Sequence, residues 1–225
     1  MSERIVAIIP ALNAERTLPK VIEETTREIE PVLVIDDGST DRTSEVARAG
    51  GAIVLRHDVN RGKGAALKTG FAWALEKGYD GVITLDADGQ HLPAEISKFL
   101  REREASGADL IVGGRAHLFQ HMLPRRRNAN RFSAWCISKC AGVRVPDSQS
   151  GFRYYSARLI RGVELRADGF DMESEVIVRA GRRGFRIVTI PIELGFVDGI
   201  STSHYKPLKD TLRIAWTVSK TRLLG

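Results

Sequence analysis

One stretch decides the fold: Val82-Ile83-Thr84-Leu85-Asp86-Ala87-Asp88-Gly89-Gln90-His91. Its apolar, partly β-branched beginning is typical of a buried strand, and Asp86 and Asp88 follow where that strand must give way to a loop. In open α/β sheets, ligands bind beyond the carboxyl ends of the strands. Paired carboxylates there suit a hard divalent cation such as Mg²⁺ or Mn²⁺, which prefers oxygen ligands. For an isolated Asp-Ala-Asp, a solvated turn is the simpler explanation, so evidence for a metal site has to come from the rest of the chain.

Strands and helices are predicted to alternate through the first half of the chain. The predicted strands cover 5–9, 32–35, 52–55, 82–85 and 110–113, and predicted helices cover 17–30 and 43–49 and begin at Gly62 and Pro93. This alternation is typical of a mostly parallel sheet flanked by helices, with right-handed crossovers. The second half is less regular, with helices expected over 124–141 and 172–182, a short strand or loop over 150–155, and a strand over 186–194.

No linker-like stretch divides the chain, so we expect one Rossmann-like α/β domain over residues 1–203. A last helix over 204–225 is expected to be basic and amphipathic, and to pack on the domain or lie at a membrane surface. It carries Trp216 and several lysines and arginines. The longest apolar runs fall far short of the ~20 residues that span a bilayer, and the first residues do not resemble a signal peptide.

The overall composition is that of a globular protein with a basic surface. The 225 residues are 43% hydrophobic and 28% charged, with a net charge of +6, which suggests an anionic partner. Cys136 and Cys140 stand four residues apart in a helical pattern without histidine spacing for zinc. We expect them to be reduced cysteines in a cytoplasmic protein.

Polar clusters follow three of the predicted strands. They are Asn13 with Glu15, Asp36 with Asp37, and Asp86 with Asp88. A parallel sheet brings such strand ends to one edge, where a carboxylate can bind a nucleotide. The glycine-rich signatures of Rossmann dehydrogenases and of P-loop enzymes are both missing. Lys63, within Gly62-Lys63-Gly64, either lies beside a diphosphate or is a solvated lysine at a helix start.

Five motifs follow one another along the chain: Pro10-Ala11-Leu12-Asn13, Val34-Ile35-Asp36-Asp37-Gly38-Ser39-Thr40-Asp41, Arg61-Gly62-Lys63-Gly64, Leu85-Asp86-Ala87-Asp88-Gly89-Gln90-His91 and Ser150-Gly151-Phe152-Arg153. Together they resemble family 2 glycosyltransferases, over roughly residues 4 to 200. The branch they resemble most transfers mannose or glucose to dolichyl or polyprenyl phosphate. The resemblance implies a GT-A fold, a nucleoside-diphosphate sugar donor and a divalent metal, Mg²⁺ or Mn²⁺.

The resemblance also implies roles for individual residues. It places the nucleotide on Pro10, Leu12 and Asp37 and the ribose and diphosphate beside Asp86 and Ala87, and we add Glu15 and Arg153 of the matching motifs as substrate-binding residues. From the residues themselves we add Lys63, as the candidate diphosphate contact, and Arg127, which lies one helical turn before Arg131. The implied catalytic residues are Asp88, Arg115 and Arg131, and the implied metal ligands are Asp88 and Gln90. Two motifs depart from the family pattern, because Glu15 comes one position late and Gly199-Ile200-Ser201-Thr202 lacks the usual lysine. A basic phosphate contact there passes to His204 or Lys206, or is absent.

The choice of acceptor depends on charge. No Asp or Glu occurs from Leu110 to Pro146, and the basic residues of that window are Arg115, Arg125, Arg126, Arg127, Arg131, Lys139 and Arg144. Arginine forks match phosphate oxygens, although a basic helix face can also be merely solvated. A phosphate monoester is already an anion at neutral pH and needs no base, whereas a hydroxyl acceptor would need one, with Asp171 or Glu173 as candidates. These two acids suit a helix N-terminus equally well.

We therefore predict a metal-dependent, inverting transfer of a hexose from a nucleoside-diphosphate sugar to a polyprenyl phosphate. The enzyme is expected to be peripheral on the inner face of the membrane, with a membrane-embedded protein as an optional partner and no nucleic acid. One alternative is a family 2 enzyme that acts on a glycan or small-molecule hydroxyl. The other, from a different class, is a non-catalytic basic module that binds lipid or nucleic acid.

Overall fold

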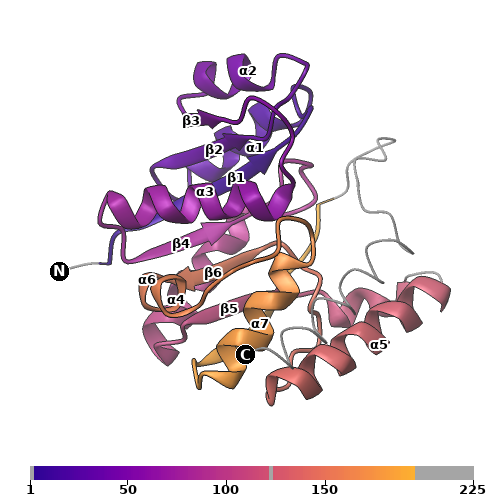
Figure 1. Cartoon of the computed structure of the whole chain (residues 1–225). Helices are drawn as coiled ribbons and strands as arrows, with labels where there is room; N and C mark the ends of the chain where they lie inside the picture. The colour runs from indigo at the N-terminus through magenta and orange to yellow at the C-terminus, as the bar shows by residue number, and fades with distance from the viewer. Residues whose placement is uncertain (1–2, 122–123, 196–225) are drawn as a thin grey trace.

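The computed structural model describes residues 3–121 and 124–195, without the side chains of 120–126 (Figure 1). Seven strands form one sheet in the order β3-β2-β1-β4-β6-β5-β7. Their bounds are β1 Ile5–Ala11, β2 Val32–Asp36, β3 Ile53–Arg56, β4 Gly81–Thr84, β5 Leu110–Gly114, β6 Arg153–Ser156 and β7 Ile187–Pro191. Only β6 runs antiparallel to its neighbours β4 and β5, so the predicted single α/β domain with a mostly parallel sheet is confirmed.

Helices cover both faces of the sheet. Their bounds are α1 Leu18–Thr26, α2 Thr43–Ala49, α3 Lys63–Glu76, α4 Ile96–Ser106, α5 Pro124–Ala141, α6 Ala157–Gly162 and α7 Met172–Arg182, with short 3₁₀ turns η1 Pro93–Glu95 and η2 Ala116–His121. One apolar core lies between the sheet and α3, α5, α6 and α7, and the other lies between the sheet and α1, α2 and α4. Because both faces are covered, β2 and β4 are buried along their whole length, as continuous apolar strands of a parallel sheet should be.

Several helix bounds match the prediction, and α1 differs for a physical reason. The helices over 43–49, 124–141 and 172–182 are found as expected. Helix α1 ends at Thr26, four residues earlier than expected. The amides of Glu28 and Ile29 both donate to the Thr25 carbonyl and form a turn after the helix, and Pro31 disfavours helical geometry in Glu30. The Thr17 hydroxyl does not cap α1 but donates to the Ala87 carbonyl at 2.6 Å. Residue 17 thereby ties the start of α1 to the loop after β4.

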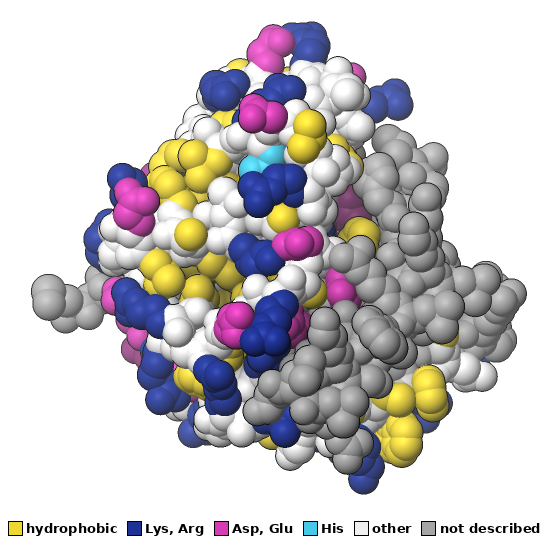
Figure 2. All heavy atoms as spheres, in the orientation of Figure 1, with side chains coloured by type: hydrophobic (Ala, Val, Ile, Leu, Met, Phe, Trp, Pro, Cys, Tyr) yellow, Lys and Arg dark blue, Asp and Glu magenta, His cyan; other side chains and the backbone are white. Residues whose placement is uncertain are grey.

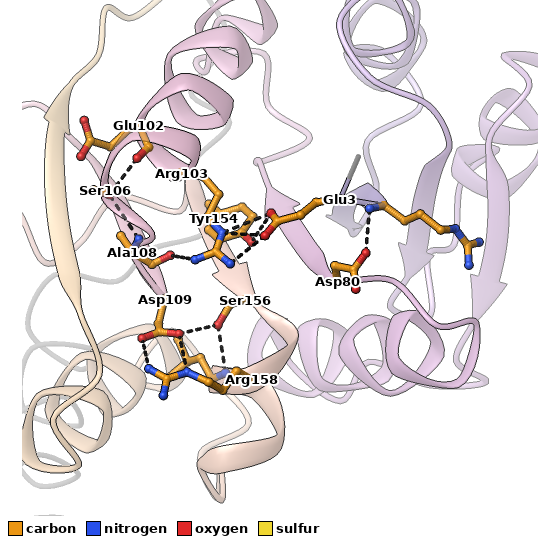
Figure 3. A network of polar contacts seen from close by, with 12 residues as sticks. Glu3, Asp80, Glu102, Arg103, Ser106, Ala108, Asp109, Tyr154, Ser156 and Arg158 are labelled. Carbon is orange, nitrogen blue, oxygen red and sulfur yellow. Dashed lines mark hydrogen bonds and ion pairs between the residues drawn. The ribbon is translucent and has the colours of Figure 1, made fainter. Parts of the chain in front are cut away.

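A polar network closes the end of the sheet where most strands begin (Figure 3). Asp109, just before β5, accepts from the Arg158 guanidinium at 2.6 and 3.0 Å and from the Ser156 hydroxyl at 3.0 Å. Nearby, Glu3 pairs with Arg103 at 2.8 Å. These charged pairs link the segments in which the strands begin. The candidate site lies at the opposite end of the sheet, at the carboxyl ends of the parallel strands.

Candidate active site

The strands β1, β2, β4 and β5 run parallel, so their carboxyl ends lie at the same end of the sheet, here called the carboxyl rim. Ala11 in β1 is in register with Asp36 in β2, and the Asp37 amide donates to the Ala11 carbonyl at 2.8 Å. Asp86 follows β4, the other neighbour of β1. The three polar clusters predicted from the sequence therefore share this rim.

Three charged side chains from distant parts of the chain meet at the centre of the rim. Lys63 Nζ lies 2.6 Å from Asp86 Oδ1 and 3.1 Å from Glu173 Oε1, and we call these three residues the Lys63 cluster. Lys63 opens α3, Asp86 follows β4 and Glu173 lies in the first turn of α7. A Cβ at Gly151 would stand 2.7 Å from Lys63 Nζ and 2.8 Å from the Asp86 carboxylate. Position 151 therefore admits no side chain while the cluster is in place.

The electrostatics of the Lys63 cluster keep Lys63 and Asp86 charged. Burial alone would lower the pKa of Lys63, but the Asp86 and Glu173 carboxylates raise it above its usual range. Burial would likewise raise the pKa of Asp86, but Lys63 holds it below its usual range. Lys63 is 14% exposed and is not the solvated lysine that the sequence left open.

A second cation, Arg115, faces the same carboxylates. It follows β5, and its Nε lies 2.7 Å from Asp147 Oδ2 while its Nη2 lies 3.3 Å from Asp147 Oδ1. The Arg115 amide also donates to Asp147, at 3.0 Å. Burial would raise the pKa of Asp147, but Arg115 lowers it, and Arg115 also interacts electrostatically with Asp86. Asp147 thus fixes Arg115 towards the rim, a role that no motif in the sequence indicates.

The loop after β4 holds the residues expected to bind a metal. Asp88 Oδ1 accepts from the Gln90 amide at 2.9 Å, and burial together with the neighbouring charge of Asp86 raises the pKa of Asp88. His91 Nδ1 accepts from the Asp86 amide at 3.1 Å, and burial lowers the pKa of His91 to about 4. His91 is therefore neutral at pH 7, and its hydrogen bond with the Asp86 amide stabilises the loop after β4.

This donor set fits a hard divalent cation. Asp88 and Gln90 offer oxygen ligands, and a cation beside Asp86 and Asp88 would offset the repulsion that raises the pKa of Asp88. Magnesium is usually held by one or two carboxylates together with substrate phosphates. Within residues 3–121 and 124–195, no group of three or more His, Cys, Asp or Glu side chains is arranged to hold a metal by itself.

The residues expected to bind the nucleotide lie at the β1–β2 side of the rim. Pro10 and Leu12 are half-buried at the end of β1. The Asp37 carboxylate accepts from the Gly62 amide at 2.8 Å and contacts His57 Nδ1 at 2.6 Å. Asp37 therefore shapes the loop that precedes α3, and His57 is a buried partner that sequence reasoning missed.

Glu15 and Ala87 are engaged by other parts of the chain. Glu15 Oε2 accepts from the Arg42 amide at 3.0 Å and so lies at the start of α2. Ala87 is buried, and its carbonyl accepts a hydrogen bond from the Thr17 hydroxyl. Both residues stay at the rim, next to the Asp37 side and the Asp88 loop respectively.

The predicted arginines divide into two groups. Arg127 and Arg131 lie one turn apart on α5, where Arg131 is exposed and Arg127 is half-buried. The Nε of Arg127 is buried and has no hydrogen-bond partner among the described residues. Arg153, by contrast, is fully buried, and its guanidinium donates to the carbonyls of Ser148, Ser150 and Glu173. We therefore assign Arg153 to positioning the 148–151 loop against α7, in place of the predicted substrate contact. Residues 199–202, His204 and Lys206 lie outside the described residues.

The carboxyl rim of this mostly parallel sheet thus carries the paired carboxylates Asp86 and Asp88 beside two held cations, Lys63 and Arg115. The chain belongs to glycosyl transferase family 2, whose family model matches residues 6–161. It is 31% identical to the polyprenol monophosphomannose synthase of Mycolicibacterium smegmatis over 209 residues, which cover 85% of this chain and 77% of that protein. It is 32% identical to the undecaprenyl-phosphate mannosyltransferase of Micrococcus luteus over 204 residues, 84% of this chain and 82% of that protein.

The fold is also found in solved structures. Glucosyl-3-phosphoglycerate synthase from Mycobacterium tuberculosis, crystallised with Mn²⁺, uridine diphosphate and glucosyl-3-phosphoglycerate, superposes with a TM-score of 0.73. The match covers 100% of this chain and 81% of that chain, at 21% sequence identity. At this identity the likeness shows the shared GT-A fold.

Proposed function

We propose that this glycosyltransferase moves a hexose from a nucleoside-diphosphate sugar to a polyprenyl phosphate, with inversion at the anomeric carbon and with Mg²⁺ or Mn²⁺. The observation that carries the proposal is the pair Arg127 and Arg131 on α5, in a stretch without any acidic residue from Leu110 to Pro146. The names of the Mycolicibacterium and Micrococcus relatives support a polyprenyl-phosphate acceptor.

The donor is proposed to lie along the carboxyl rim. Pro10, Leu12 and Asp37 hold the nucleoside end, and Lys63 and Arg115 face the diphosphate. Asp88 and Gln90 would hold the cation, which as a Lewis acid stabilises the charge that develops on the leaving diphosphate. Lys63 contributes to the same stabilisation from a fixed position, since the carboxylates of Asp86 and Glu173 already hold its ammonium group.

The acceptor is proposed to be a phosphate because its binding needs cations and its reaction needs no base. A buried donor without a partner costs about 1–3 kcal/mol. The Nε of Arg127 has no hydrogen-bond partner among the described residues, which favours an anion that accepts its hydrogen bond. A hydroxyl acceptor would require a free general base. Glu173, one of the two candidates, is already engaged by Lys63 at 3.1 Å, which favours the phosphate.

The proposed acceptor is a membrane lipid, so the enzyme is proposed to work as a peripheral protein at the inner face of the membrane. In the part of the chain that the structure describes, no helix combines the length and apolarity needed to cross a bilayer. The predicted basic helix over 204–225 lies outside the described residues and stays a prediction.

A screen of radiolabelled donors tests this function. Purified enzyme is incubated with sugar nucleotides of different base and hexose, with polyprenyl phosphate and Mg²⁺ or Mn²⁺. We expect label to enter the organic-extractable lipid with at least one donor, and to be released by mild acid as expected for a glycosyl phosphate. Transfer only to water-soluble glycans or small molecules would favour the hydroxyl-acceptor alternative, and no metal-dependent donor binding would favour a non-catalytic module.

A further inference from the structure

The outer face of α5 carries two large aromatic side chains in water. Phe132 is 65% exposed and Trp135 is 58% exposed. Their rings stack with centroids 6.0 Å apart and an interplanar angle of 26°. In the space-filling view, hydrophobic side chains project from the surface at α5 (Figure 2). Residues 3–121 and 124–195 contain no other exposed aromatic side chain of this kind.

The aromatics are not part of the protein core. Helix α5 packs against α7 with the opposite side of the helix, where Ala134, Ile137 and Ala141 are buried. A Cβ at Gly181 of α7 would lie 2.2 Å from the Ala141 carbonyl, which shows how closely the two helices approach. Among the described residues, the outer face of α5 therefore takes no part in the packing of the domain.

The exposed charges on the outer face of α5 are positive and favour an anionic partner. Arg131 and Lys139 are exposed on the same side of α5 as Phe132 and Trp135, and we call these four residues the α5 patch. No acidic residue lies between Leu110 and Pro146 to balance the cations. Cations that flank aromatic rings match an anionic bilayer, where the rings enter the headgroup region and the cations meet lipid phosphates.

Other occupants are less well matched by charge. A second copy would bring the same patch to a two-fold interface, so that like charges face one another. The chain's own residues 204–225 contain Lys206, Lys209, Arg213, Lys220 and Arg222 against one acid, Asp210. This segment would also oppose cations with cations.

We infer that the α5 patch docks on an anionic phospholipid bilayer, with Phe132 and Trp135 at headgroup depth. The inference rests on the proposed function in one respect, because docking there sets Arg131 against the surface in which a lipid phosphate acceptor lies. Docking itself requires neither donor nor acceptor.

The first test is vesicle binding by the full chain. Phe132→Ala/Trp135→Ala is compared with Ile53→Ala, which removes an exposed apolar side chain (40% exposed) from the edge strand β3. The vesicles are phosphatidylcholine with about 30% phosphatidylglycerol, which makes their surface anionic. On them we expect the double variant to partition about 10- to 100-fold more weakly than the native chain. The Ile53 variant should bind like the native chain. Unchanged binding of the double variant would overturn the inference.

A second measurement uses the native patch and does not depend on that variant folding. The chain has three tryptophans, so Trp73→Phe/Trp216→Phe leaves Trp135 as the sole reporter. We expect its emission to shift to the blue on anionic vesicles and to be quenched by brominated lipid, with both effects weakening at high salt. Bound protein with unquenched Trp135 would assign docking to another surface. Blue-shifted emission without vesicles would show that the protein itself covers the patch, and it would also overturn the inference.

Calorimetric titration with the sugar nucleotide separates this inference from the proposed function. The Phe132→Ala/Trp135→Ala variant should bind donor as the native chain does. Vesicle binding that fails while donor binding and lipid-phosphate glycosylation persist in detergent would refute the docking surface alone. Docking without any donor binding would refute the proposed function alone.

Discussion

Removal of the Lys63 ammonium should destabilise the fold strongly, because the Asp86 and Glu173 carboxylates lose the one cation that contacts both of them directly, and Arg115, which pairs with Asp147, remains as the nearby cation. Lys63 is 14% exposed, and its partners Asp86 and Glu173 are 30% and 6% exposed. Breaking a buried ion pair by removing one partner costs about 3–5 kcal/mol. Water reaches Asp86, so we expect Lys63→Met to lower the free energy of unfolding by about 3 kcal/mol, the low end of that range.

A matched variant on the same helix serves as the control. Lys68 also lies on α3 and pairs with Asp168, but that pair is 30% and 57% exposed. Exposed pairs contribute about 0–1 kcal/mol, so Lys68→Met should be nearly neutral. Urea unfolding followed by circular dichroism at pH 7 measures both. In the double variant Lys63→Met/Glu173→Gln, removal of one carboxylate should restore part of the loss. Equal losses for the Lys63 and Lys68 variants, or no recovery in the double variant, would refute the reasoning.

Three further predictions concern acceptor, metal and pH. Arg131→Ala should weaken use of the lipid phosphate about 10- to 150-fold, from the loss of a hydrogen bond to a charged group; steady-state kinetics that show weaker donor binding with an unchanged acceptor KM would contradict this. Asp88→Asn, like EDTA, should abolish turnover while circular dichroism shows an intact fold, and full activity in EDTA would exclude the metal. Burial would raise the pKa of Asp109, but hydrogen bonds from Arg158 and its neighbours outweigh it and lower the pKa. Asp109→Asn should therefore cost about 1–2 kcal/mol at pH 7. The pKa of Asp109 in the folded chain lies below the unfolded value of about 4. The difference in unfolding free energy between the native chain and Asp109→Asn should therefore be complete above about pH 4 and vanish as the pH falls through the folded pKa. An equal difference in unfolding free energy at pH 7 and pH 2 would contradict this.

The fold was largely predictable because its signals are local. Continuous apolar strands end in Gly, Pro or Asp, and the helices over 43–49, 124–141 and 172–182 carry clear start and stop signals. The antiparallel insertion of β6 between β4 and β5 was not predictable. A strand of four residues, Arg153–Ser156, carries no information about which neighbours it will pair with or in which direction.

The place of the site, at the carboxyl ends of the strands, was predictable from the sequence, but the contacts of its side chains were less so. Residues of motifs that follow strands, such as Asp86 and Asp88, come to the carboxyl rim as expected. The partners of those residues depend on distant segments, so Lys63 was left open between a diphosphate contact and a solvated side chain, whereas Asp86 and Glu173 hold it. Asp147, which orients Arg115, belongs to no local motif. Arg153 was recognised by its motif, but only the packed structure shows that its guanidinium is buried and donates to three backbone carbonyls.

The central claim is that a lipid phosphate is the nucleophile. A pair of acceptors that differ only in that group tests it: polyprenyl phosphate and the corresponding polyprenol, each incubated with the donor found in the radiolabel screen and with Mg²⁺ or Mn²⁺ in detergent. We predict transfer to the phosphate alone, with the ³¹P signal of the acceptor changing from monoester to diester and with inverted anomeric configuration in the product. Comparable transfer to polyprenol, or to water-soluble hydroxyl acceptors in preference to the phosphate, would contradict the account.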